Sequence, residues 1–184
     1  MSTPTMTGAE LQTLRESCGL SREDLATLAG VQARTLKHWE HGRSGVPADV
    51  GELVQRIEST IAQAVQQAGA ALQDAQTAAQ GAAPRDVVLI RYQSSADLAR
   101  YRPDMAGLPA GVQGAIVARV RHLAQALPGW SGVPVRIVWM MPEHYEPWRA
   151  ACQQPDTEAT RSLWAAQQVQ AQAQPHRGDQ LPHL

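Results

Sequence analysis

The apolar positions of residues 7–42 recur with the period of short amphipathic helices. Ser21 and Asp24 have the spacing of a capping box and precede the apolar positions Leu25 and Leu28. Gly30 follows, and a residue without a Cβ turns most easily at positive φ. The pattern predicts a helix that begins after Ser21 and ends in a sharp turn at Gly30.

A second helix is predicted from Gln32 to about His41, with Leu36 and Trp39 facing inward three residues apart. A helix with a small, polar and basic outer face, packed across a glycine turn, can enter the major groove of DNA. The outward positions are Gln32, Ala33, Arg34, Lys37 and His38.

Upstream, Thr7 and Glu10 form another capping-box pair before the apolar positions Leu11 and Leu14. This pattern predicts a further amphipathic helix that ends at Gly19. Together, the three helices predict a compact helix-turn-helix unit.

A long helix is predicted to start at Val46-Pro47, since proline is common in a first helical turn. Its apolar positions alternate by four and three, which is a heptad pattern that weakens to alanine. One interpretation is a helix packed against its own C-terminal domain, and the other is a dimer seam. The positions are Val50, Val54, Ile57, Ile61, Ala64, Ala68, Ala71, Ala75 and Ala78.

After the break at residues 81–84, the pattern changes to strands alternating with helices. The continuous apolar run Val87 to Ile90 is typical of a strand covered on both faces. The predicted elements are a strand over 86–92, a helix capped by Ser94 or Ser95 through 101, a loop over 108–111, a helix over 112–127, a strand over 133–141, and helices over 142–152 and 157–173.

These elements predict a mainly α fold with an N-terminal helix-turn-helix domain of four to five helices. A long connecting helix leads from it to a small α/β dimerisation domain. The predicted bounds are 1–60 for the DNA-binding domain, 61–83 for the connecting helix, 84–152 for the α/β domain and 153–184 for a C-terminal helix and tail. The last ten residues, 175–184, are predicted to be disordered.

Two strands alone are marginally stable and leave apolar edges exposed. Pairing with the same unit of a second chain would lengthen the sheet and cover these edges. The sequence therefore predicts a homodimer whose dimerisation residues are Val87, Leu89, Val135, Ile137 and Trp139.

The chain has 184 residues and a formal net charge of -1, so any attraction to nucleic acid must be local. Such a local excess of positive charge lies between residues 31 and 45. This segment contains the cations Arg34, Lys37 and Arg43 and only one acid, Glu40. The basic residues belong to the predicted outer helix and the turn after it, where DNA contacts are expected.

Several classes of protein are not indicated by the sequence. The start, MSTPTM, lacks a secretory signal pattern, and no apolar run approaches the length of a membrane span. Cys18 and Cys152 lack the spacing of a zinc site or a disulfide framework. The segment 142–149, PEHYEPWR, is interpreted as structural because acids commonly occupy a first helical turn. We therefore expect a cytoplasmic protein that is not an enzyme and has no cofactor or metal.

Individual DNA contacts follow from side-chain chemistry. Arg34 has the geometry to read guanine O6 and N7, and Gln32 to pair with adenine. Ala33 is small enough to contact a thymine methyl group. The predicted phosphate contacts lie at helix starts and the following turn, where backbone contacts usually occur. They are Ser21, Arg22, Arg43 and Ser44.

The first fifty residues resemble the lambda-repressor and Cro-like helix-turn-helix family. In that family an arginine before the first turn pairs with the glutamate of Trp-Glu-x-Gly. The resemblance therefore implies a structural ion pair between Arg15 and Glu40. The matching segments are Leu14-Arg15, Gly19-Leu20-Ser21, Leu25-Ala26, Gly30-Val31, Thr35-Leu36 and Trp39-Glu40-His41-Gly42.

A narrower resemblance begins at Trp39 and fades beyond about residue 105. It is to the YdiL-like regulators, which include the anti-CRISPR-associated (Aca) repressors of phages. This resemblance implies a dimer that represses its own small operon. The matching residues are Trp39, Glu40, Gly42, Arg43, Ser44, Val46, Pro47, Asp49 and Val50.

The predicted function is a sequence-specific repressor that binds double-stranded DNA as a homodimer on an inverted repeat. Half-sites about one helical turn apart would place the two recognition helices in successive major grooves. Two alternatives remain: an antitoxin whose C-terminal part binds a toxin, and a regulator that responds to a small molecule.

Overall fold

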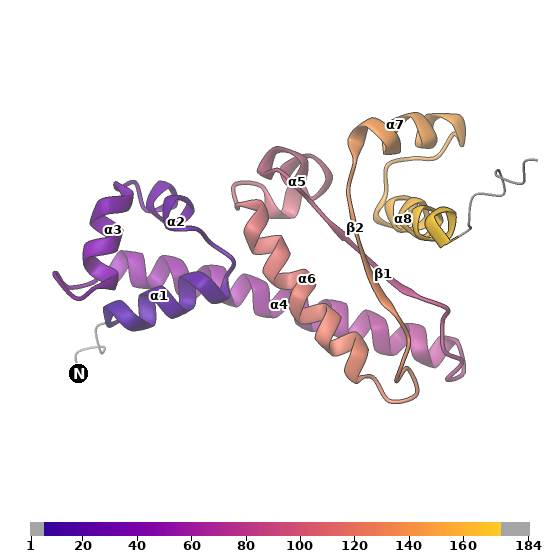
Figure 1. The fold of residues 1–184 in the computed structure, drawn as a ribbon, viewed down its shortest axis with the longest axis horizontal. Coiled ribbons are helices and arrows are strands. Elements are labelled where there is room, and N and C mark those ends of the chain that lie inside the picture. Colours follow the sequence, from indigo (N-terminus) through magenta and orange to yellow (C-terminus); the bar gives the residue numbers. More distant parts are fainter. Residues whose placement is uncertain (1–5, 174–184) are drawn as a thin grey trace, which may run out of the picture.

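The computed structural model describes residues 6–173. The predicted tail over 175–184 and most of the MSTPTM segment lie outside the described residues. The described part forms eight α-helices, one short 3-10 helix and two strands, and is mainly helical, as predicted (Figure 1). A helix-turn-helix domain lies at one end and a two-stranded sheet lies in the C-terminal part.

Three short helices begin the fold, and each ends close to where the sequence predicts. Both predicted capping boxes are confirmed, because the Thr7 and Ser21 hydroxyls accept hydrogen bonds from the backbone N–H groups of Glu10 and Asp24. The core beneath them includes Leu11, Leu25 and Leu36, all fully buried. The helices are α1 (Gly8–Ser17), α2 (Arg22–Leu28) and α3 (Ala33–Glu40).

The long helix α4 (Ala48–Ala78) begins directly after Pro47 and runs along most of the molecule (Figure 1). Its predicted stripe is only partly the buried face. Val50, Val54, Ile57 and Ile61 are buried, whereas Ala71, Ala75 and Ala78 are exposed. Val65 and Leu72 pack into the core in their place. The buried face shifts because α6 (Ala110–Ala126) packs along α4.

The two strands, β1 (Val87–Arg91) and β2 (Val135–Trp139), pair in parallel, with Val87 opposite Val135 and Arg91 opposite Trp139. β2 is shorter than predicted, because Pro134 lacks an N–H and Val133 donates instead to the Trp130 carbonyl in a turn. The connection between the strands runs through α5 (Ser95–Tyr101), the 3-10 helix η1 (Pro103–Met105) and α6.

Two helix starts within this connection differ in how well the sequence predicts them. Ser94, rather than Ser95, caps α5, since its hydroxyl accepts from the Asp97 N–H. The predicted loop over 108–111 is wrong at its end, since α6 starts at Ala110. The preceding Pro109 has an extended backbone, and the Ala110 N–H donates to the Ser95 hydroxyl at 3.1 Å.

Helices cover both faces of the sheet. α6 contacts both strands, and Val87 packs with Ala124 and Trp130. The final helices, α7 (Pro142–Ala151) and α8 (Glu158–Ala173), follow β2, and α8 contacts both strands (Figure 1). α6, with α4 packed behind it, therefore lies on one side of the two-stranded sheet, and α8 lies on the other (Figure 1).

The N-terminal helices and the α/β part share one continuous core. The Arg119 guanidinium of α6 donates to the Ser17 carbonyl of α1 at 3.2 Å and lies 3.9 Å from Glu58 of α4. The predicted boundary at residues 60 and 61 falls within an unbroken helix. α4 therefore belongs to the packing of both parts.

Candidate nucleic-acid interface

The turn between α2 and α3 has the geometry of a helix-turn-helix. Gly30 has a φ of 67°, and a Cβ there would meet nothing within 4 Å. Its positive φ, rather than crowding, therefore favours glycine. The Val31 N–H donates to the Ala26 carbonyl at 2.9 Å and closes the turn. Gln32 is the residue before α3, and its side chain makes no capping hydrogen bond.

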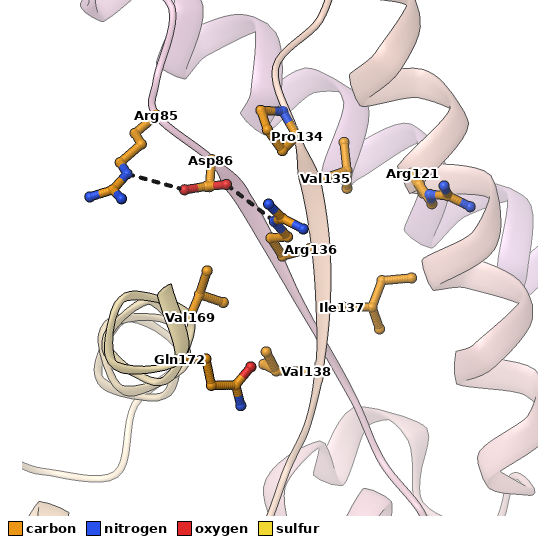
Figure 2. Close-up of a pocket in the computed structure, with 10 residues that line it drawn as sticks. All are labelled: Arg85, Asp86, Arg121, Pro134, Val135, Arg136, Ile137, Val138, Val169 and Gln172. Carbon is orange, nitrogen blue, oxygen red and sulfur yellow. Dashed lines mark hydrogen bonds and ion pairs between the residues drawn. The ribbon is translucent and has the colours of Figure 1, made fainter. Parts of the chain in front are cut away.

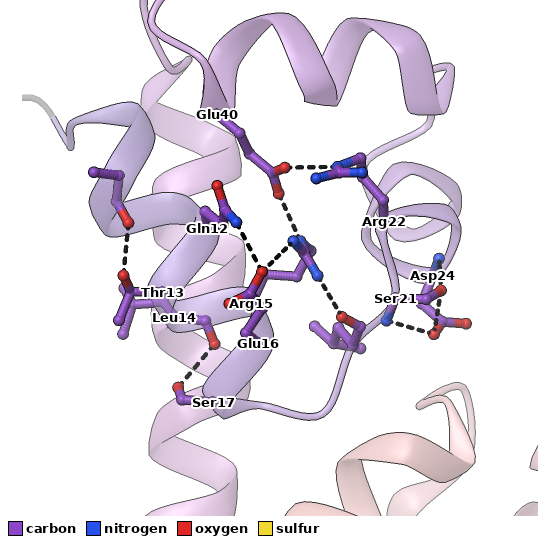
Figure 3. A network of polar contacts seen from close by, with 12 residues as sticks. Gln12, Thr13, Leu14, Arg15, Glu16, Ser17, Ser21, Arg22, Asp24 and Glu40 are labelled. Carbon is purple, nitrogen blue, oxygen red and sulfur yellow. Dashed lines mark hydrogen bonds and ion pairs between the residues drawn. The ribbon is translucent and has the colours of Figure 1, made fainter.

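Three charged side chains connect α1, α2 and the end of α3 (Figure 3). Arg15 Nε lies 2.6 Å from Glu40 Oε1, and Arg22 Nε lies 2.7 Å from Glu40 Oε2. Arg15 also donates to the Leu20 carbonyl at 2.9 Å. The Glu40 carboxylate is fully buried, so its two arginine partners hold α3 against the other helices.

The electrostatics of this network follow from burial and hydrogen bonding. Burial alone raises the pKa of Glu40, but hydrogen bonds from Arg15 and Arg22 outweigh it and leave this pKa lowered. The hydrogen bond to Glu40 raises the pKa of Arg22. Glu40 is therefore a carboxylate at neutral pH, and it forms ion pairs with the buried Arg15 and the partly exposed Arg22.

Arg22, one of the predicted phosphate contacts, also belongs to this network. Its Nε is bound to Glu40, and one third of its side chain is exposed. The sequence does not reveal this third member of the network, because Arg22 and Glu40 lie 18 residues apart with no local pattern to connect them.

The outer face of α3 and the turn that follows it carry exposed cations. Arg34, Lys37 and Arg43 are exposed and make no ion pair with the described residues. The only acid between residues 31 and 45, Glu40, is buried. Because the negative charge of this segment lies below the surface, its exposed side chains are uniformly neutral or basic.

The remaining predicted base contacts differ in exposure. Gln32 is exposed, whereas Ala33 and His38 are half-buried, and Ala33 packs against the core. His41 is exposed and follows Arg34 and Lys37 at the spacing of one helix face. The predicted base contacts do not include His41, although its spacing of i+7 from Arg34 indicates the same helix face.

Two serines among the predicted phosphate contacts are also exposed. The Ser21 hydroxyl accepts from the Asp24 N–H and donates to the Asp24 carboxylate at 2.7 Å. The Ser21 hydroxyl is therefore already engaged in capping the start of α2. Ser44 lies beside Arg43 in the exposed turn before α4.

The segment over 142–149 contributes to packing within the C-terminal part. Glu146 accepts hydrogen bonds from the Tyr101 hydroxyl and from Arg100, both at 2.8 Å, and from Arg149. Tyr145 is fully buried and packs edge-on against Trp164. Burial is the larger cause, and the hydrogen bond to Glu146 the smaller one, of a raised pKa of the Tyr101 hydroxyl.

The predicted dimerisation residues fall into two groups. Val87 is buried and Leu89 is half-buried, and both pack in the core beside α6. Ile137 and Trp139 of β2 are 45% and 44% exposed, and Val135 is half-buried. Trp139 also lies beneath the Arg91 guanidinium, 5.1 Å from the ring centre.

The described residues lack the features of several other kinds of site. Within 6–173, no cluster of three or more His, Cys, Asp or Glu side chains has the arrangement of a metal site. Cys18 is buried, Cys152 is exposed, and both thiols are free. No helix in this part of the chain has the length and apolarity needed to cross a membrane.

Residues 7–61 match a protein family described as a helix-turn-helix domain. The match covers α1, α2, α3 and the first part of α4. It supports a DNA-binding regulator, and proteins of this kind are typically not enzymes. No curated protein sequence matches this chain.

Proposed function

We propose that this chain is a sequence-specific transcriptional repressor that binds an inverted-repeat operator as a homodimer. α3 acts as the recognition helix in the major groove. Arg34 and Gln32 read base edges, and Lys37, Arg43 and Ser44 contact phosphates. Arg22 has a smaller part in DNA contact than its position suggests, because Glu40 holds its Nε.

The observation that supports this proposal best is the separation of charges around α3. Glu40 is withdrawn from the surface and compensated by two arginines, whereas Arg34, Lys37 and Arg43 are left exposed. The phosphate backbone of DNA therefore meets a face of α3 that has no exposed carboxylate. This local positive charge favours association with DNA although the chain as a whole has a net charge of -1.

The resemblance to the YdiL-like and Aca repressors supports a narrower proposal. We infer that the protein represses the operon that encodes it, and that this operon also contains an anti-CRISPR gene. The matching run from Trp39 to Val50 includes the buried Glu40 and the exposed Arg43.

Selection of bound sequences from random duplex DNA tests the proposal. We expect enrichment of an inverted repeat whose half-sites lie about one helical turn apart. The promoter upstream of the chain's own gene should contain this sequence. Absence of any enriched sequence would refute sequence-specific binding.

Arg34→Ala tests which residue reads the bases. We expect loss of discrimination at one base position per half-site, at a cost of about 1–3 kcal/mol per contact. Arg56→Ala is the matched control, because Arg56 is exposed on α4 and the change removes the same charge. Unchanged base preference with weaker binding overall would place Arg34 on phosphate instead.

A further inference from the structure

The two outer edges of the sheet differ. In a parallel ladder, alternate residues direct their N–H and C=O groups to opposite sides. The Val87 N–H donates to the Pro134 carbonyl, and the Arg91 carbonyl accepts from the Met140 N–H. The backbone groups of Val88, Ile90 and Tyr92 therefore face the outer edge of β1.

A side chain covers this edge of β1. Gln113 of α6 donates to the Ile90 carbonyl at 2.8 Å, and its amide oxygen lies 3.5 Å from the Tyr92 nitrogen. Gln113 is 5% exposed, so one carboxamide occupies the position that a neighbouring strand would take. The edge of β1 is protected in this way against pairing with another chain.

The edge of β2 has no such cover. By the same alternation, Val135, Ile137 and Trp139 direct their backbone groups outward, and within residues 6–173 no strand pairs with them. A groove follows this edge (Figure 2). On one side it is lined by Ile137 of β2 and by Arg121 of α6. On the other side it is lined by Val138 of β2 and by Val169 of α8.

The side chains beside the open edge are also apolar and exposed. Among the described residues, four large hydrophobic side chains are more than 40% exposed, and Ile137 and Trp139 are two of them. Unpaired backbone groups and exposed apolar side chains thus coincide on one strand. Such an edge favours the addition of another strand.

We propose that β2 pairs antiparallel with β2 of a second copy about a two-fold axis at Ile137. The two sheets then form one four-stranded sheet in the order β1, β2, partner β2, partner β1. This inference deepens the homodimer of the proposed function and rests on it for the identity of the partner. Val87 and Leu89 remain core residues in this dimer.

The register follows from the positions of the free backbone groups and charges. With the axis at Ile137, Ile137 faces the partner's Ile137 and Val135 faces the partner's Trp139. All three outward-facing residues of each β2 then exchange hydrogen bonds. An axis at Arg136 would instead oppose two arginines and leave Trp139 without its pairing.

The separation of like charges also favours the register centred on Ile137. It sets Arg136 opposite the partner's Val138, so that no cation opposes a cation across the strands. Arg136 remains 3.4 Å from its own Asp86, which also lies 3.7 Å from Arg85 (Figure 2). Asp86 therefore offsets one of the two positive charges of Arg85 and Arg136 within each copy.

The chain's own residues 174–184 are a poorer occupant of this edge. α8, whose Val169 and Gln172 line the groove, precedes them directly. However, Pro175 and Pro182 lack an N–H, and Gly178 and Asp179 are poor strand formers. A second copy offers three matching donors and acceptors and is therefore the better occupant.

Cysteine cross-linking of the full chain tests the pairing and its register. In a Cys152→Ser background, Ile137→Cys should form a disulfide between copies, since facing Cα atoms in such a pair lie about 5.5 Å apart. Trp139→Cys alone is the matched control. Its counterpart lies four residues further along the partner strand, about 13 Å away, so it should not cross-link. Val135→Cys combined with Trp139→Cys should cross-link again.

Ile137→Pro provides a second test, because it removes an outward-facing N–H without removing a hydrogen bond to β1. We expect an unchanged circular dichroism spectrum and a monomer by light scattering, whereas Ile137→Val remains dimeric. A wild-type monomer, a dimer that Ile137→Pro leaves intact, or cross-linking at Trp139 alone would overturn the proposal. So would a dimer that appears only after residues 174–184 are removed.

DNA binding is measured separately, so the two proposals can fail independently. A dimer that cross-links at Ile137 and selects no DNA sequence supports the interface and refutes the proposed function. A chain that selects an inverted repeat and does not cross-link at Ile137 refutes the interface alone.

Discussion

Gly19 and Gly111 touch through their backbones. Gly19 has a φ of 71° in the turn after α1, and Gly111 lies in the first turn of α6. A Cβ built on Gly111 would overlap the Gly19 carbonyl oxygen. The turn that precedes α2 and α3 is therefore packed directly on the α/β part.

Gly111→Ala should destabilise the protein, although alanine favours a helix more than glycine does. The new methyl group would meet backbone that cannot rotate away, and such overpacking costs about 1–3 kcal/mol. Urea denaturation measures the free energy of unfolding. Gly69→Ala is the matched control, because its Cβ would meet only the flexible end of Leu123, at 3.4 Å. Equal effects of the two substitutions would argue against a rigid contact.

The buried carboxylate of Glu40 predicts a specific dependence of stability on pH. Its pKa is lowered from the ordinary value of 4.5, so its stabilising contribution is present above about 4.5. The contribution is lost as pH falls through the lowered pKa of the folded state. Glu40→Gln should cost about 3 kcal/mol at neutral pH, the low end for a broken buried pair, because Arg15 keeps its ion pair with Glu16 and Arg22 is partly exposed.

Thermal melting of Glu40→Gln and of the wild type across pH measures this contribution. The difference in melting temperature should be constant from pH 7 to about 5 and should shrink below about 4.5. Glu10→Gln is the control, because the Glu10 carboxylate has a lowered pKa but lies on the surface, in the capping box with Thr7. A difference that stays constant down to pH 3 would exclude titration of Glu40 as the cause.

Lys37 and Arg43 are expected to hold phosphates rather than read bases. Neutralising either should weaken binding to all sequences alike, and log affinity should depend less steeply on log salt. The slope should fall by about one unit for each phosphate that is no longer neutralised, and therefore by about two in a dimer. Arg56→Ala again provides the control. An unaltered slope for Lys37→Ala would remove Lys37 from the set of residues that hold phosphate.

The parts of the fold that depend on local sequence were predictable, and the contacts between distant elements were not. The capping boxes at Thr7 and Ser21 and the turn at Gly30 involve residues at most five apart, so spacing alone reveals them. The link from Arg22 to Glu40 spans 18 residues and has no such signature. Similarly, the heptad stripe predicts Ile61 as buried but not Leu72, because the crossing of α6 sets the buried face there.

The parallel pairing of the strands and the unequal cover of their edges also lay beyond the sequence reasoning. Apolar runs predict strands over 86–92 and 133–141 but carry no information on their direction. In the sequence, Gln113 is an ordinary polar residue of a helix, and only the path of α6 past β1 brings its amide to the Ile90 carbonyl. The sequence therefore predicts that an edge needs cover, while the structure identifies which edge already has it.

Gln113→Ala should uncover the edge of β1. The Ile90 carbonyl and the Tyr92 N–H would lose their partner, at a cost of about 1–3 kcal/mol if they stay dry. If β2 already joins two copies, a second open edge allows chains of dimers to grow. Light scattering should therefore show particles larger than a dimer, and more of them at higher protein concentration. Gln125→Ala on the exposed side of the same helix should leave the size unchanged. Combining Gln113→Ala with Ile137→Pro should limit assembly to pairs joined through β1, because only one edge of each sheet then remains open. Continued growth in this double variant would show that assembly does not proceed through the sheet edges.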